Sequence, residues 1–223
     1  MLEKYRNQAG VLPGEAAYIF DRLGDWIRIN LMTLSTKQKQ AKKLEVSQER
    51  LAELVTLVEI VPGKIAVLDE AVSGYRKYLR DSRDMALKII ILDGAEIGLA
   101  RQLEKVTREN EAVLSDILGS ANQVLRVYIL EALIAAQVEN EDIFKFIVKN
   151  YQFTQDDIEK NKAVIDEHLK LVEEKLPLDD ESKQQAVESY LGEARKFQNA
   201  GLNVEAYDWV KKAKNVAYIK ISN

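Results

Sequence analysis

Residues 120–138 read SANQVLRVYILEALIAAQV, the longest nearly unbroken apolar stretch of the chain, which two charged residues interrupt. A helix that is apolar on every side is stable in water when other helices surround it. Gly119 predicts the end of the preceding helix. Ser120, followed three residues later by Gln123, predicts a capping box that starts the next helix. The stretch therefore predicts a helix at the centre of a bundle.

The composition extends this prediction to the whole chain. Among 223 residues there are three prolines and ten glycines, and 47% of the residues are hydrophobic. Long stretches rich in Ala, Leu, Glu, Lys and Gln favour helices. We predict an all-α fold, with a multi-helix bundle over residues 1–152 built around helix 120–138. A C-terminal three-helix unit that contains an αα-hairpin is predicted over 153–223.

Apolar spacing places the other helices of the predicted bundle. Pro13 fits the first turn of a helix, and apolar residues then recur every three or four positions, which predicts a stripe that faces the core. Leucines and valines repeat every seven residues from Leu44, and the helix they predict ends before Pro62. A further helix is expected over 85–106. The predicted core stripe of the first helix comprises Ala17, Phe20, Leu23, Ile27, Leu31 and Leu34, and that of the helix after Pro62 comprises Ile65, Leu68, Val72, Tyr75 and Leu79.

Two helices carry basic residues at helical spacing, and these are the candidate binding residues. If the two stripes faced one another, they would form a groove for an anion or a nucleic acid. Acidic residues lie near both stripes, so ion pairs along a solvated helix explain the same pattern. The stripes are Arg76, Arg80 and Arg83 on one helix, and Arg101, Lys105 and Arg108 on the next.

Most catalytic layouts lack their residues in this chain. There is no cysteine and a single histidine, His168, which we expect at the surface or at its boundary. A di-iron bundle needs two Glu-x-x-His motifs, and the residue three before His168 is Ile165. Asp93 and Glu96 share a helix face and could serve a Mg²⁺-dependent enzyme, which stays open as an alternative. We predict no cofactor, no metal site and no catalytic residue.

The sequence also predicts where the protein resides. The N-terminus, MLEKYRNQAG, lacks the apolar core of a secretory signal. No charge-free apolar run approaches the ~18 residues that a membrane span needs. We therefore expect a cytoplasmic protein without a membrane span.

The C-terminal third carries alanines, aromatic residues and a turn glycine at the spacing of a helical hairpin. Small alanines that face one another let two helices approach closely, and Gly201 suits the left-handed turn between them. The string resembles the helical hairpin of the archaeal family DUF357, and it is also similar to a single tetratricopeptide unit. The resemblance implies an archaeal source and a helical fold, and it transfers no catalytic residue. It is carried by Tyr190, Ala194, Phe197, Gly201, Ala206 and Ala213.

Taken together, these patterns favour a non-enzymatic interaction or scaffold protein. It would use helical faces to bind a protein partner or a second copy of itself. Two alternatives stay open: a nucleic-acid or anion-binding protein that uses the Lys/Arg stripes, and a Mg²⁺-dependent enzyme that uses paired carboxylates.

Overall fold

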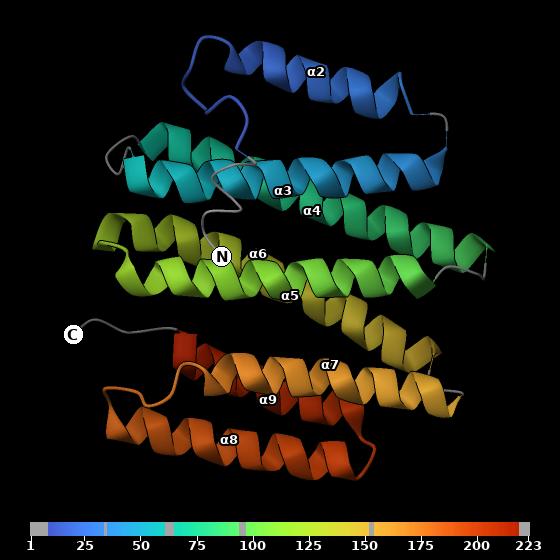
Figure 1. The fold of residues 1–223 in the computed structure, drawn as a ribbon, viewed down its shortest axis with the longest axis vertical. Coiled ribbons are helices and arrows are strands. Elements are labelled where there is room, and N and C mark those ends of the chain that lie inside the picture. Colours follow the sequence, from blue (N-terminus) through green and yellow to red (C-terminus); the bar gives the residue numbers. More distant parts are fainter. Residues whose placement is uncertain (1–8, 34, 61–64, 94–96, 152–153, 219–223) are drawn as a thin grey trace. The chain divides into compact units, whose positions relative to one another are not determined.

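A computed structural model describes residues 9–33, 35–60, 65–93, 97–151 and 154–218. The described residues form helices joined by turns and contain no strand, which confirms the predicted all-α fold (Figure 1). The helices are α2 (Tyr18–Asn30), α3 (Thr36–Ile60), α4 (Ile65–Asp93), α5 (Ile97–Ser120), α6 (Gln123–Asn150), α7 (Gln155–Glu173), α8 (Glu181–Asn199) and α9 (Asn203–Tyr218).

The chain divides into two compact units between Ile143 and Phe144, inside α6. The sequence predicts a boundary nine residues later, at 152/153, just before the helix that Thr154 is expected to cap. The last turns of α6 pack instead with α9. The ring of Phe144 stacks on that of Tyr207 with centroids 4.7 Å apart. The whole of α2 to α5 therefore lies in the first unit, and α7 to α9 lie in the second.

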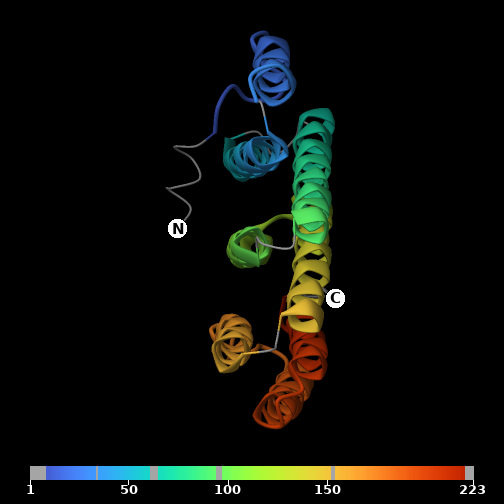
Figure 2. The ribbon, with the colours of Figure 1, turned by 90° about the vertical axis from the view of Figure 1, so that its right-hand side faces the viewer.

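The centre of the first unit is the antiparallel pair of α3 and α4. Leu51 and Leu54 of the predicted heptad are fully buried, as are Leu68 and Leu79 of the predicted α4 stripe. Ile65 is the exception: it lies at the first turn of α4 and is 53% exposed, so its predicted place in the core is wrong. Figure 2 shows α2 beside α3 at the edge of this unit.

The boundaries of two predicted helices differ from the structure. The helix predicted over 85–106 is two helices, because α4 ends at Asp93 and α5 begins at Ile97. The predicted capping box is also wrong, since Ser120 is the last residue of α5. The cap of α6 is Asn122, whose side-chain Oδ1 accepts hydrogen bonds from the backbone N–H groups of Val124 (3.1 Å) and Leu125 (3.0 Å). An asparagine at this position satisfies the free N–H groups as well as serine does.

The apolar stretch in α6 is buried on one side rather than all round. One face of the helix is in the core of the first unit, where Leu125, Ile129 and Leu133 are at most 4% exposed. The prediction that other helices surround this stretch is wrong, because side chains on the opposite face are 44–63% exposed. Those exposed side chains are Val124, Val127, Ile134 and Val138.

The second unit contains α7 and the α8–α9 hairpin. The Thr154 side chain accepts a hydrogen bond from the backbone N–H of Asp157 and caps α7, as the sequence predicts. Gly201 adopts a φ of +77° between α8 and α9, which is the left-handed turn predicted for it. His168 is fully buried, so its predicted surface position is wrong. Its Nδ1 lies 2.7 Å from the Nζ of Lys214, and its ring meets that of Tyr207 edge to face.

Candidate interaction surface

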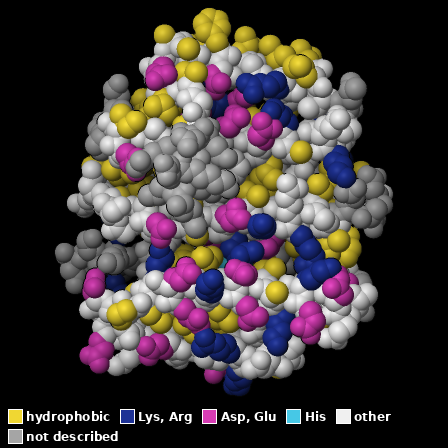
Figure 3. Space-filling view, viewed as in Figure 1, with side chains coloured by type: hydrophobic (Ala, Val, Ile, Leu, Met, Phe, Trp, Pro, Cys, Tyr) yellow, Lys and Arg dark blue, Asp and Glu magenta, His cyan; other side chains and the backbone are white. Residues whose placement is uncertain are grey.

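The outer face of α2 is apolar and exposed to solvent. Phe20 is 74% exposed and Trp26 is 53% exposed, although the sequence predicts that the apolar stripe of this helix faces the core. The prediction of an inward stripe is therefore wrong for α2. Figure 3 shows hydrophobic side chains gathered along the edge of the molecule over this helix. We call this surface the α2 face; it comprises Ile19, Phe20, Leu23, Trp26, Ile27, Leu31 and Met32.

The inner face of α2 buries Ile29 and Tyr18 together with Asp25, and its carboxylates contact one arginine of α3. The guanidinium of Arg50 is buried, and it forms ion pairs with Asp25 and, at 3.2 Å, with Asp21. It also pairs with Glu53 of its own helix and lies 3.4 Å from the hydroxyl of Tyr18. These five residues form the Arg50 cluster. They explain the orientation of α2, because a buried carboxylate such as Asp25 needs a buried cation opposite it.

The close packing of α3 against α4 positions the Arg50 side chain. A Cβ atom placed on Gly74 of α4 would lie 3.4 Å from the Cγ and Cδ atoms of Arg50. The aliphatic stem of Arg50 therefore lies on the backbone of α4 at a glycine, where there is no side chain to push it away. The guanidinium is then directed toward α2.

The Arg50 cluster contains more negative than positive charge. Three carboxylates, those of Asp21, Asp25 and Glu53, surround one guanidinium. Burial raises the pKa of Glu53 to about 8, against the lowering effect of Arg50. Burial also raises the pKa of Asp25, and the pKa of Tyr18 is raised well above its usual value by burial and by Glu53. The inner side of α2 can thus take up a proton under mild conditions.

A hollow of about 690 Å³ adjoins the α2 face at the N-terminal end of the helix. Its rim includes an ion pair in which Arg22 Nη1 lies 2.7 Å from Glu70 Oε1. Ile19 belongs both to the hollow and to the α2 face, so the two are continuous. The residues that line the hollow are Gly14, Glu15, Ala16, Tyr18, Ile19, Arg22 and Glu70.

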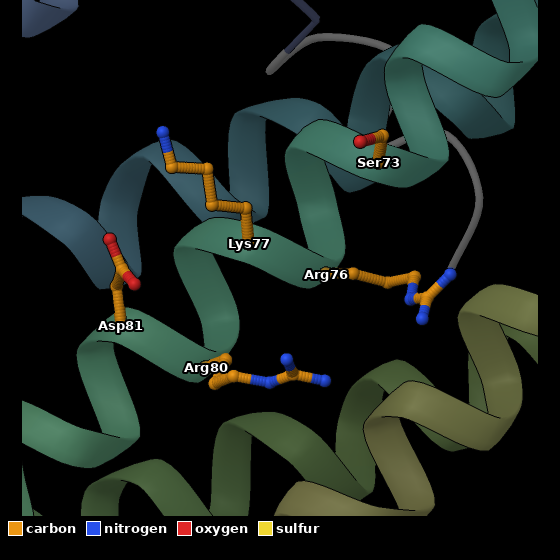
Figure 4. Close-up of a pocket in the computed structure, with 5 residues that line it drawn as sticks. All are labelled: Ser73, Arg76, Lys77, Arg80 and Asp81. Atoms are coloured by element: carbon orange, nitrogen blue, oxygen red, sulfur yellow. The ribbon is translucent and has the colours of Figure 1, made fainter.

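The first predicted basic stripe is opposed by acidic residues of α6. Arg76 forms an ion pair with Glu131, and Arg83 lies 3.0 Å from Glu139. Arg80 is 3.6 Å from the same Glu139. Figure 4 shows Arg76 and Arg80 extending from α4 toward the neighbouring helices. A shallow hollow of about 330 Å³ lies here, lined by Ser73, Arg76, Lys77, Arg80 and Asp81.

The second predicted stripe is paired along its own helix, α5. Arg108 lies 3.0 Å from Glu104, and Lys105 lies 4.0 Å from Glu109. Arg101 lies on the same helix and is half-buried. Carboxylates thus neutralise members of both stripes, and a groove for an anion or a nucleic acid stays a prediction.

The acidic pair considered for Mg²⁺ falls at an undescribed part of the chain. Asp93 ends α4, and its side chain, like the whole of Glu96, lies outside the described residues. Within the part that the structure describes, no three His, Cys, Asp or Glu side chains are grouped as metal ligands. No described helix is long and apolar enough to cross a membrane.

Sequence reasoning missed the Arg50 cluster. The periodicity of α2 shows that its two faces differ, but it does not show which face points inward. Asp21 and Asp25, spaced by four, were the available signal, because they mark a helix face that could bind one cation. Arg50 lies beside the seam residue Leu51, and nothing in the heptad marks it as buried.

Comparison with known proteins adds a family match over the same region. Residues 10–124, slightly more than half of the chain, match the family described as Domain of unknown function (DUF5667). The matched region contains α2 to α5, and so includes the α2 face and the Arg50 cluster. No curated protein and no solved structure matches the chain. The match does not reach 153–223, where the resemblance to DUF357 stays a prediction.

Proposed function

The chain belongs to the DUF5667 family, and from that premise we propose that it is a non-enzymatic interaction protein whose α2 face binds a protein partner. The observation that carries the proposal is the inverted orientation of α2. A helix on a soluble domain normally turns its apolar stripe to the core and its charges to water. Here the two aspartates of the helix are inside, and seven large apolar side chains are outside.

The burial free energy that the exposed apolar side chains of α2 forgo explains why this orientation needs a binding partner. Each apolar side chain left in water forgoes roughly 1.5–3 kcal/mol of burial. The Arg50 cluster adds little net stability in compensation, because desolvation of its charges offsets most of their attraction. Contiguous exposed apolar patches of this kind mark interaction sites. A cytoplasmic location belongs to the same proposal.

The test is site-specific photo-crosslinking in cells that produce the protein. A photo-reactive residue in place of Phe20 is expected to give a discrete protein adduct, because Phe20 lies within the α2 face. Leu23→Lys in the same chain is expected to abolish the adduct, since a charge at the centre of an apolar contact opposes its desolvation.

The matched control places the same photo-reactive residue at Ala163, an exposed apolar position of α7. The absence of any adduct at position 20, or equal adducts at positions 20 and 163, would contradict the proposed function.

A further inference from the structure

The α2 face has the composition of the centre of an interface. Its exposed arc contains no charged residue. The polar residue on it, Asn30, turns its side-chain amide back and donates a 2.9 Å hydrogen bond to the carbonyl oxygen of Trp26. Aromatic anchors without nearby charges are typical of the energetic centre of an interface. Charged side chains are found at the borders of the arc, as in an interface rim.

The size of the α2 face matches half of a stable dimer interface. Aromatic side chains have areas of roughly 150–250 Å² and aliphatic ones somewhat less, so seven side chains exposed by 36–75% offer on the order of 700 Å². A standard interface buries about 800 Å² on each partner. A patch of this extent is at or above the largest found on ordinary monomers, about 300–600 Å².

The two ends of the α2 face complement one another in shape. At the N-terminal end lies the hollow of about 690 Å³ that Ala16 and Ile19 help to line. At the C-terminal end, Leu31 and Met32 project into solvent and are 65% and 70% exposed. In an antiparallel pair of α2 helices, the C-terminal end of each helix meets the N-terminal end of the other. Met32 of each copy then reaches the hollow of the other, and its flexible side chain suits an irregular cavity.

The charged side chains beside the α2 face are already paired within one copy of the chain. Asp21 lies 3.2 Å from Arg50, and Arg28 lies 3.6 Å from Asp25. Arg22 lies 2.7 Å from Glu70. Apolar contact between two copies of the face therefore leaves these charges compensated.

We infer that the partner of the α2 face is a second copy of this chain, docked with its α2 antiparallel about a twofold axis near Gly24. This inference rests on the proposed function and names its partner. The same surface patch is used by both copies, as a twofold interface requires.

A membrane surface fits the α2 face less well. Helices that lie in a lipid interface carry lysine and arginine on the polar face beside the apolar one. The polar side of α2 carries two aspartates as well as Arg22 and Arg28, so its charges sum to zero. Both arginines are already paired with carboxylates, Arg22 with Glu70 and Arg28 with Asp25. The formal net charge of the chain is −4, which opposes binding to anionic lipids.

The experiment uses the full chain with the substitution Trp209→Phe. Of the two tryptophans, this leaves Trp26 in place. Mass by light scattering and Trp26 emission are measured over a wide range of protein concentration. We expect the mass to double and the Trp26 emission to shift to the blue at the same concentration. A monomeric mass with unchanging emission at all concentrations would overturn the inference.

Two substitutions test whether the α2 face forms the dimer interface. Leu23→Lys is expected to weaken the dimer roughly 30-fold or more, as for the central residue of an interface. Ile91→Lys, at a 70% exposed apolar position of α4, is the matched control and should leave the dimer unchanged. A dimer that resists Leu23→Lys, or that is equally sensitive to both variants, would overturn the inference.

The outcomes separate the inference from the proposed function. If the chain is monomeric but still crosslinks from position 20 to another protein, the proposed function stands and the self-association is overturned. A monomer whose Trp26 emission shifts to the blue only with vesicles of phosphatidylcholine and phosphatidylglycerol contradicts both, because the face would then bind lipid.

Discussion

Arg50 decides which side of α2 faces the protein. Its buried guanidinium contacts two aspartates of α2, and no other orientation of this helix would bring both to it. The same residue leaves the cluster acidic, because Glu53 is a third carboxylate around one cation. The contacts that bury Asp25 are therefore also those that leave Trp26 exposed.

The first prediction concerns pH. Burial raises the pKa of Glu53 from 4.5 to about 8, so the folded protein binds this proton more tightly than the unfolded chain does. The stabilisation from this group is full below pH 4.5 and is lost as the pH rises through 8. We expect the free energy of unfolding to fall by about 1–3 kcal/mol between pH 5.5 and 8.5.

Urea unfolding followed by Trp26 emission measures this dependence. A chain with Leu23→Lys and Trp209→Phe is used, so that neither self-association nor Trp209 emission contributes. Glu53→Gln should flatten the pH dependence, whereas Glu45→Gln, at a largely exposed ion pair with Lys42, should leave it in place. Equal slopes in all three chains would show that Glu53 titrates normally.

Among the elements, α2 shows where sequence reasoning succeeds and where it stops. The all-α fold, the α3 heptad, the Thr154 cap and the Gly201 turn follow from spacing and propensity, which act locally. The orientation of α2 depends on Arg50, which lies 25 residues beyond Asp25 in sequence. The exposed side of α6 depends likewise on which helices pack beside it. Periodicity shows that a helix has two different faces, and tertiary contacts determine which of the two is buried.

The second prediction compares two glycines of the hairpin. Gly201 has a φ of +77°, a conformation that alanine adopts with strain, so Gly201→Ala should cost about 1 kcal/mol. Gly192 lies in α8, and a Cβ atom there would have no neighbour within 4 Å. Gly192→Ala should therefore stabilise by about 0.5–1 kcal/mol through helix propensity. Urea unfolding followed by Trp209, in a chain with Trp26→Phe, measures both; changes of the same sign would refute the argument.

At the scale of the whole molecule, each compact unit holds one of the two tryptophans. Trp26 reports on the first unit and Trp209 on the second. The described contacts of Arg50 all lie within the first unit. A chain with Trp209→Phe therefore reports the unfolding of the first unit, and a chain with Trp26→Phe reports that of the second.

The third prediction uses this arrangement. Arg50→Ala leaves buried carboxylates without their cation and should destabilise the first unit by about 3–5 kcal/mol. The unfolding curve followed by Trp26 should move to lower urea, and the curve followed by Trp209 should stay in place. Lys42→Ala, at a surface ion pair, is the control and should move neither curve by more than about 0.5 kcal/mol. If both curves moved together with Arg50→Ala, the chain would unfold as one cooperative body.

The inner side of α2, with Asp25, Ile29 and Tyr18, holds the helix in place, so its outward residues contribute little to folding. Side chains such as Ile19 and Phe20, three-quarters exposed, can be exchanged during evolution with small effect on whether the domain folds. The α2 face can therefore be altered by substitution while Arg50 and its acidic neighbours keep the orientation of the helix.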